Sequence, residues 1–165
     1  QNLLEVHADA KFLIPATNDK NVHFIKGRIR NNPTKNLKLI KGKVDEILSS
    51  SNIAIAASGT ASLQIALHKK PMIIIYKGSW ISYFIWKMVR LIPNVSLPNI
   101  LLNENFVPEM LQHRAEPNLL SKKACEIIKD KKYSKKIESK FNKLHKDLKK
   151  NTSSLILKII KPYLK

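Results

Sequence analysis

Residues Ile53–Ser79, "IAIAASGTASLQIALHKKPMIIIYKGS", contain the pattern that decides the fold. The apolar run Ile53–Ala57 has the length of a strand and no polar residue, which is typical of a strand buried on both faces. After Ser-Gly-Thr, Leu63 and Leu67 follow the i, i+4 spacing of a helix, which Pro71 ends. A second apolar run, "MIIIY", comes next. Strand, helix and strand in this order predict a βαβ crossover in a parallel sheet, and therefore the α/β class.

The flanking segments extend this pattern. "KFLIPAT" (Lys11–Thr17) and "NVHFIKG" (Asn21–Gly27) are β-rich runs bounded by turn residues, which predicts two strands. "LKLIKG" predicts a third short strand, and "KVDEILSSS" predicts a brief helix. From Glu116 onward the chain consists of lysine-rich segments with helical spacing. We therefore predict an α/β domain over residues 1–115 and a basic helical C-terminal extension, residues 116–165, that packs on it.

Length and composition set the outer limits. A chain of 165 residues with 44% hydrophobic residues can bury one sizeable core. A single cysteine, Cys125, excludes an internal disulfide and fits a reducing compartment. The chain shows no basic-then-apolar signal at its start and does not begin with methionine, so we expect a fragment or a processed piece of a longer protein.

The formal net charge of +18 permits three interpretations: nucleic-acid binding, attraction to an anionic membrane, or no function at all. Lysine supplies almost all of the excess, and abundant lysine, isoleucine and asparagine are also what a compositionally biased genome produces. Sequence-specific readers of nucleic acids use arginine forks and stacking aromatic residues. No such interleaving occurs here, so we expect no specific nucleic-acid partner.

The turn Ser58-Gly59-Thr60 lies where open α/β sheets bind ligands, at the carboxyl end of a parallel strand. Ser58 is a suitable N-cap, and Gly59 lets the backbone approach a ligand closely. The first-turn N–H groups of Gly59, Thr60 and Ala61 would be free to bind phosphate, which explains why the turn carries no lysine. The alternative is an ordinary capped helix start.

Four segments together resemble the C-terminal half of the lipid-A-disaccharide synthases: "AASGTASLQIALHKKPMIIIYKGS", "SYFIWKMVRLI", "VSLPNILLNENFVPEMLQ" and "EPNLL". These enzymes are bacterial glycosyltransferases with two facing Rossmann-like domains, the GT-B architecture. The resemblance runs from about Lys11 to about Leu120 and is dense from Ile53 to Gln112. "SGTA", "SLPNIL" and "VPE-L-Q" at these mutual spacings form its specific signature.

This resemblance implies a function. In the family, UDP-activated 2,3-diacylglucosamine donates its sugar to the 6-hydroxyl of 2,3-diacylglucosamine 1-phosphate, with inversion and release of UDP. The C-terminal domain holds the nucleotide, so residues 1–115 would form a partial Rossmann-like UDP-sugar-binding domain. The resemblance implies no metal and no cofactor. It places the protein in the cytoplasm of a Gram-negative bacterium, peripheral to the inner membrane.

The resemblance also assigns nucleotide-binding residues. The turn would hold phosphate, the polar face of the following helix would meet the ribose, and the remaining residues would line the cleft. Gln64 departs from the family, which usually has glutamate there; glutamine keeps an acceptor but loses a charge-assisted hydrogen bond, which predicts about tenfold weaker nucleotide binding. The assigned residues are Ser58, Gly59, Thr60, Gln64, Asn99, Glu109 and Gln112.

The family's C-terminal domain begins with a strand and a Gly-Ser-Arg segment whose arginine reaches the diphosphate. This chain starts downstream of that point. The base and the acceptor site of the family belong to the N-terminal domain. The resemblance therefore implies no catalytic residue in this chain. The chain would be a fragment, one product of a split gene or a remnant, and in the split-gene case a companion chain would carry the N-terminal half.

The segment "SWISYFIWKMVRLI" (Ser79–Ile92) is amphipathic. As a helix it would be about 21 Å long, too short for the ~30 Å hydrocarbon core of a bilayer. It would pack between the sheet and the C-terminal helices, or lie in the membrane interface and, with lysines from Lys122 to Lys165, contact anionic lipid. The membrane-facing candidates are Trp80, Phe84, Trp86, Lys87 and Arg90.

Other chemistry finds little support. The five histidines lie far apart and none stands at metal-ligand spacing from Cys125, and neither a Walker A loop nor a Gly-x-Ser-x-Gly elbow occurs. The rival hypothesis is a non-catalytic basic module that binds anionic lipid or nucleic acid through its lysine-rich helices, with the βαβ unit as scaffold.

Overall fold

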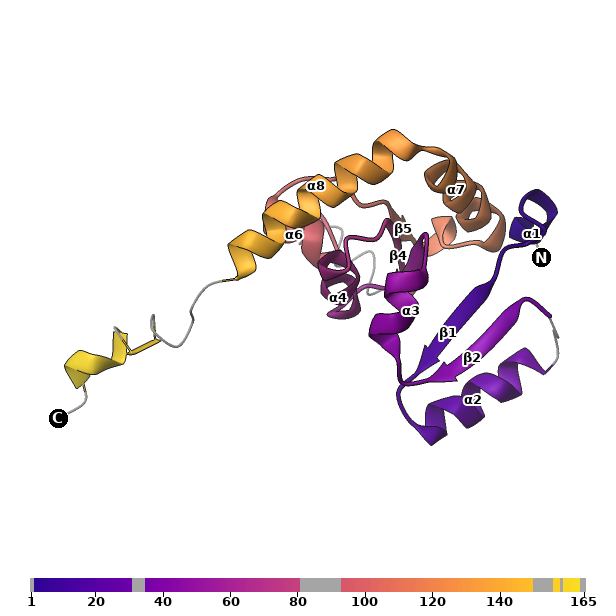
Figure 1. Ribbon diagram of the computed structural model, residues 1–165, viewed down its shortest axis with the longest axis horizontal. Coiled ribbons are helices and arrows are strands. Elements are labelled where there is room, and N and C mark those ends of the chain that lie inside the picture. Colours follow the sequence, from indigo (N-terminus) through magenta and orange to yellow (C-terminus); the bar gives the residue numbers. More distant parts are fainter. Residues whose placement is uncertain (1, 31–34, 81–92, 150–155, 158, 164–165) are drawn as a thin grey trace.

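The computed structural model describes residues 2–30, 35–80, 93–149, 156–157 and 159–163 (Figure 1). Short helices and strands alternate up to the last strand, and two longer helices follow. In chain order the elements are α1 (Asn2–Val6), β1 (Phe12–Ala16), α2 (Asp19–Ile29), β2 (Leu37–Lys41), α3 (Val44–Ser50), β3 (Ala54–Ala57), α4 (Ala61–Leu67), β4 (Met72–Tyr76), α6 (Leu97–Leu102), β5 (Glu109–Leu111), a 3₁₀ turn (Gln112–Arg114), α7 (Pro117–Lys129), α8 (Lys131–Leu148) and a 3₁₀ turn (Lys161–Tyr163).

The strands form two parallel sheets. β1 pairs with β2, and β3, β4 and β5 form a three-stranded sheet in that order. β3 and β4 are parallel with Ile55 opposite Ile73, and β4 and β5 are parallel with Ile75 opposite Met110. The predicted α/β class and the β3–α4–β4 unit are confirmed. The parallel sheets with their helices are consistent with a Rossmann-like GT-B domain.

The three-stranded sheet is covered on both faces, because successive side chains of a strand point to opposite sides. Met72 and Ile74 pack in one cluster with residues of α4 and α8, while Ile73 packs in a second cluster with residues of α7. Figure 1 shows α8 running across α4 and α6, with α7 beside β5. The sheet is thus the middle layer of a three-layer arrangement.

Helix α8 belongs to the core. Its residues Ile137, Phe141 and Leu144 follow the helical i, i+4, i+7 spacing and are at most 3% exposed. They share one cluster with Met72 and Ile74 of the central strand. The lysines of α8 occupy its other faces. The boundary at residue 115 stays a prediction.

One predicted strand is wrong. "NVHFIKG" lies within helix α2, Asp19–Ile29. The side chain of Asn18 accepts a hydrogen bond from the backbone N–H of Asn21 at 2.9 Å and caps the helix. The half-buried residues Val22, Ile25 and Ile29 follow helical spacing. This cap and this spacing prevail over the β propensity of the individual residues.

The burial predicted for β3 is also wrong. Ile55 is 48% exposed and Ala57 is exposed, whereas the strand was expected to be buried on both faces. In the described part of the chain β3 is an edge strand, paired only with β4. The α7 layer centres on Ile73 and Met110 and leaves Ile55 partly uncovered. The apolar run therefore predicted the strand correctly but not its surroundings.

Candidate functional site

The three sequence motifs converge beside the three-stranded sheet. The Ser58 turn follows β3, "SLPN" (Ser96–Asn99) starts α6, and Glu109 opens β5. The backbone N–H of Ser58 donates to the carbonyl oxygen of Ile75 at 3.1 Å, and its Oγ donates to the carbonyl oxygen of Val95 at 2.7 Å. The turn is therefore tied both to β4 and to the segment that precedes α6.

Ser58 is not the N-cap of α4, contrary to prediction. The helix begins at Ala61, and the N-cap position is Thr60, whose side chain makes no capping hydrogen bond. The Ser58 hydroxyl is engaged by Val95, a partner 37 residues away in sequence, and is not available to the helix. A tertiary contact has replaced the local one that the sequence predicted.

The backbone of the turn is open on the side of Gly59. Its φ is +148°, in the range that disfavours side chains, and a Cβ built there would meet no atom within 4 Å. The Gly59 carbonyl accepts from Ser62 Oγ at 2.6 Å. Among the described residues, no acceptor is recorded for the N–H groups of Gly59, Thr60 and Ala61. Within the part of the chain that the structure describes, the turn thus offers main-chain donors that have no acceptor and lie next to free space.

Glu109 holds the corner before α6. Its Oε2 accepts from the backbone N–H of Val95 at 3.0 Å, and its Oε1 accepts from the N–H of Ser96 and from Asn99 Nδ2, both at 2.9 Å. A carboxylate that accepts backbone N–H groups at a helix start is favourable for both partners. Because Val95 also accepts from Ser58, Glu109 fixes the position of the turn through one intervening residue.

Asn99 is fully buried and completes this corner. Its Nδ2 donates to the carbonyl oxygen of Val107 at 2.9 Å as well as to Glu109, and its Oδ1 accepts from the N–H groups of Phe106 and Val107 at 3.1 and 2.9 Å. The Asn99 side chain therefore uses both N–H groups of Nδ2 as donors and both lone pairs of Oδ1 as acceptors. The geometry gives Asn99 and Glu109 a structural role; contact with a nucleotide stays a prediction for both.

Gln112 clamps the segment that follows β4. It is 2% exposed, its Oε1 accepts from the backbone N–H of Gly78 at 2.8 Å, and its Nε2 donates to the Gly78 carbonyl at 3.1 Å. This pair of bonds mimics a strand ladder just beyond the paired residues Tyr76 and Leu111. Gln112 therefore holds the carboxyl ends of β4 and β5 together, and its contact with a nucleotide likewise stays a prediction.

Gln64 lies one helical turn beyond Thr60 on the exposed side of α4. Its Nε2 donates to Oδ1 of Asp45 on α3 at 3.1 Å, and Nε2 of His68 lies 2.9 Å from the same oxygen. Hydrogen bonds from His68 and then from Gln64 hold the pKa of Asp45 below its usual range. No local sequence pattern connects Asp45 to a side chain 19 residues away.

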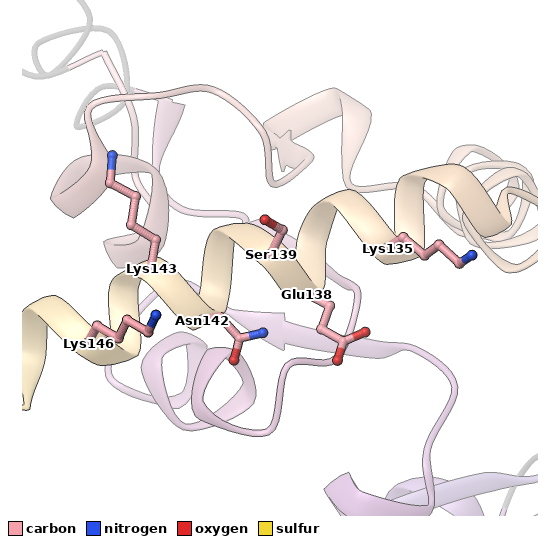
Figure 2. Close-up of a pocket in the computed structure, with 6 residues that line it drawn as sticks. All are labelled: Lys135, Glu138, Ser139, Asn142, Lys143 and Lys146. Carbon is pink, nitrogen blue, oxygen red and sulfur yellow. The ribbon is translucent and has the colours of Figure 1, made fainter.

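A shallow hollow lies elsewhere, along the outer side of α8 (Figure 2). All the residues that line it come from this single helix, and none belongs to the three motifs. Figure 2 shows Lys143 pointing away from Glu138 and Asn142. A surface formed by one helix encloses no ligand, so we do not place the site there. The lining residues are Lys135, Glu138, Ser139, Asn142, Lys143 and Lys146.

Two further features of the described residues concern metal ions and membranes. No group of three or more His, Cys, Asp or Glu side chains stands close enough to hold a metal ion. None of the described helices has the length and apolarity needed to cross a bilayer. Of the membrane-facing candidates, Trp80 is 64% exposed; Phe84, Trp86, Lys87 and Arg90 lie outside the described residues.

Comparison with known proteins gives one consistent result. The family model of the lipid-A-disaccharide synthetases matches residues 1–160. The chain is 32% identical to the lipid-A-disaccharide synthase of Methylobacillus flagellatus over 99% of its own length and 44% of that protein. It is 34% identical to the enzyme of Aromatoleum aromaticum over 98% of its own length and 42% of that protein. It is 36% identical to the enzyme of Dechloromonas aromatica over 70% of its own length and 30% of that protein.

The chain thus spans less than half the length of these curated relatives. The match extends through α7 and α8 and includes the Ser58 turn, the "SLPN" corner and the β5 segment that the contacts described above join. The resemblance inferred from the motifs is confirmed: the chain belongs to the lipid-A-disaccharide synthase family.

Proposed function

We propose that this chain is the donor-binding part of a lipid-A-disaccharide synthase. It binds the UDP of UDP-2,3-diacylglucosamine while the sugar passes to the 6-hydroxyl of 2,3-diacylglucosamine 1-phosphate, which forms the lipid A disaccharide. Membership of the family supports this assignment. The observation that carries it is the uncharged turn at Gly59, whose N–H groups meet no acceptor among the described residues and face open space.

The diphosphate would occupy the space beside Gly59. Main-chain N–H groups bind phosphate oxygens without a cationic side chain, and they require no movement when they are already held in place. The contacts of Ser58 with Ile75 and Val95 supply that rigidity. Gln64, one turn further along α4, would accept from the ribose. Asn99, Glu109 and Gln112 would contribute by fixing the segments that lie beside the turn.

The remaining partners follow from the acylated substrates. A companion part of the enzyme, with the N-terminal half of the family, would bring the acceptor and the base. The protein would work in the cytoplasm at the surface of the inner membrane, where exposed lysines of α7 and α8 are drawn to anionic lipid. Trp80, with its side chain 64% exposed, is the membrane-facing candidate within the described residues.

Titration with UDP at moderate salt tests the assignment. We expect UDP to raise the melting temperature of the chain saturably, as any ligand of the native state does. Gly59→Asp should abolish this rise, because a carboxylate would stand beside the N–H groups meant for phosphate. Gly59→Ala has the same backbone strain without the charge and should keep most of the rise. Gly27→Asp adds the same charge on α2 and should keep all of it.

The rival basic module predicts a different result. Its binding would be limited to polyanions such as vesicles with phosphatidylglycerol or nucleic acid, would fall steeply with salt, and would not depend on residue 59. That outcome would refute the donor-binding assignment. Equal loss of the UDP effect in Gly59→Ala and Gly59→Asp would show that the conformation of the turn, and not its open donors, matters.

A further inference from the structure

The carboxamide of Gln64 is held by a carboxylate from another helix. Asp45, in the first turn of α3, accepts at Oδ1 from Gln64 Nε2 at 3.1 Å and from His68 Nε2 at 2.9 Å. On the far side of the imidazole, Ser49 Oγ lies 3.3 Å from His68 Nδ1. Two successive turns of α4 are thereby tied to α3 through one carboxylate oxygen.

This contact decides which end of the carboxamide is free. An ionised carboxylate can only accept hydrogen bonds, so the NH₂ group of Gln64 must face Asp45. The Oε1 atom is then the end of the carboxamide that does not contact Asp45, and no described residue donates to it. Without this partner the carboxamide of Gln64 would rotate, and it would present either its NH₂ group or its oxygen to a ligand. Asp45 therefore favours the orientation of Gln64 in which Oε1 remains as a hydrogen-bond acceptor.

We propose that Asp45 is a positioning residue of the nucleotide site, which orients Gln64 so that its Oε1 accepts from the 2′- and 3′-hydroxyls of the UDP ribose. The inference rests on the proposed function and adds to it a residue that no motif contains. Gln64 N donates to the Thr60 carbonyl at 3.3 Å, so the oriented side chain stands on the same helical face, one turn from the phosphate-binding turn.

The same geometry gives a reason for glutamine at this position. A glutamate at residue 64 would place a second carboxylate within hydrogen-bond distance of Asp45, and two carboxylates at that distance repel each other. With Asp45 present, an amide is the side chain that pairs with it. The residue at position 64 that binds best therefore depends on the residue at position 45. The effects of the two substitutions on the free energy of UDP binding should not be additive.

The first test compares UDP with 2′-deoxy-UDP, which lacks one hydroxyl of the diol. We expect the unmodified chain to bind UDP about five- to tenfold more tightly, the effect of one hydrogen bond of about 1 kcal/mol. In Asp45→Ala this preference should fall to less than twofold, and the affinity for 2′-deoxy-UDP, which keeps the 3′-hydroxyl, should fall by a smaller factor than the affinity for UDP. Glu46→Ala, which removes the adjacent exposed carboxylate of α3, is the matched control and should keep the preference.

The second test uses the coupling. Gln64→Glu alone should weaken UDP binding, because its carboxylate faces Asp45. Asp45→Ala combined with Gln64→Glu should restore tight binding and the preference for UDP, since a carboxylate accepts with either oxygen and needs no orientation. A double variant no better than the worse single variant would overturn the proposal.

A merely structural tie between α3 and α4 would give another pattern. Asp45→Ala would then lower the melting temperature and weaken UDP and 2′-deoxy-UDP equally, which would refute a positioning role. Should Asp45→Ala fail to fold, Asp45→Asn replaces it, because asparagine keeps an acceptor oxygen but can also offer its NH₂ group. The preference for UDP should then fall only in part, and an unchanged preference would count against the proposal.

An independent readout needs no nucleotide. The side-chain amide signals of Gln64 in an NMR spectrum should shift as the pH falls below 3.8, the ordinary pKa of Asp45, because protonation removes the acceptor. Signals that do not move through this range would overturn the orientation itself. A chain that binds neither nucleotide would instead refute the proposed function, so the two failures are distinguishable.

Discussion

Replacement of Phe141 by alanine is expected to lower the free energy of unfolding by about 4 kcal/mol. Phe141 is 1% exposed and packs edge-to-face against Phe106, with ring centroids 5.7 Å apart and an interplanar angle of 62°. Met72 and Ile74 of the central strand belong to the same cluster. The cavity would lie between the sheet and α8, where layers on both sides resist collapse.

Denaturant-induced unfolding monitored by circular dichroism measures this loss. Because domains of this size are stable by only about 5–15 kcal/mol, the variant should be close to its limit of stability. Leu148→Ala is the control on the same helix; Leu148 is 45% exposed, so its loss should be below about 1 kcal/mol. Equal losses in the two variants would show that α8 is not part of the core.

Replacement of Glu109 by alanine is expected to lower the free energy of unfolding by about 3 kcal/mol and to weaken UDP binding as well. The change removes the acceptor of three donors, the N–H groups of Val95 and Ser96 and Asn99 Nδ2. Each buried donor left without a partner costs about 1–3 kcal/mol, and water will reach some of them at this half-buried corner. Since Val95 accepts from Ser58, the phosphate-binding turn should lose part of its rigidity.

Unfolding experiments and UDP titration on the same sample separate the two effects. Glu138→Ala removes an exposed carboxylate on α8 and should change neither quantity. Glu109→Gln should still be destabilised, because one end of the carboxamide would be a donor that faces donors. A stable Glu109→Ala variant with weakened UDP binding would mean that Glu109 acts on the nucleotide directly, as the family resemblance implied. A stable variant with normal binding would refute both roles.

Local pattern predicted much of the fold. The β3–α4–β4 unit, β2 and α3 all occur where short apolar runs, helical spacing and turn residues placed them, because these signals act over fewer than about ten neighbouring residues. The strand predicted for Asn21–Gly27 was wrong, and the reason is also local. A capping hydrogen bond from Asn18 and the spacing of Val22, Ile25 and Ile29 outweighed single-residue β propensity.

Burial was less predictable than secondary structure. The run Ile53–Ala57 is apolar throughout, yet Ile55 is 48% exposed. The sequence of a strand shows which residues are apolar enough to be buried, but it does not show whether a helix packs over them. For Ile55 this depends on where α7 crosses the sheet. The lysine-rich segment after Glu116 has the converse property. It was predicted to form helices that pack on the domain, and the lysines give no sign that Ile137, Phe141 and Leu144 of α8 share one buried cluster with the central strand.

The sequence by itself determined the family, the parallel α/β class and the uncharged turn at Gly59, because motifs and periodicity are properties of neighbouring residues. Only the tertiary structure decided what the polar residues of the motifs do. Ser58 binds Val95 and does not cap α4, Gln112 clamps Gly78, and Asp45 orients Gln64. Each of these contacts joins residues 19 or more positions apart, and a hydrogen-bonding side chain takes its role from the partner that folding brings to it.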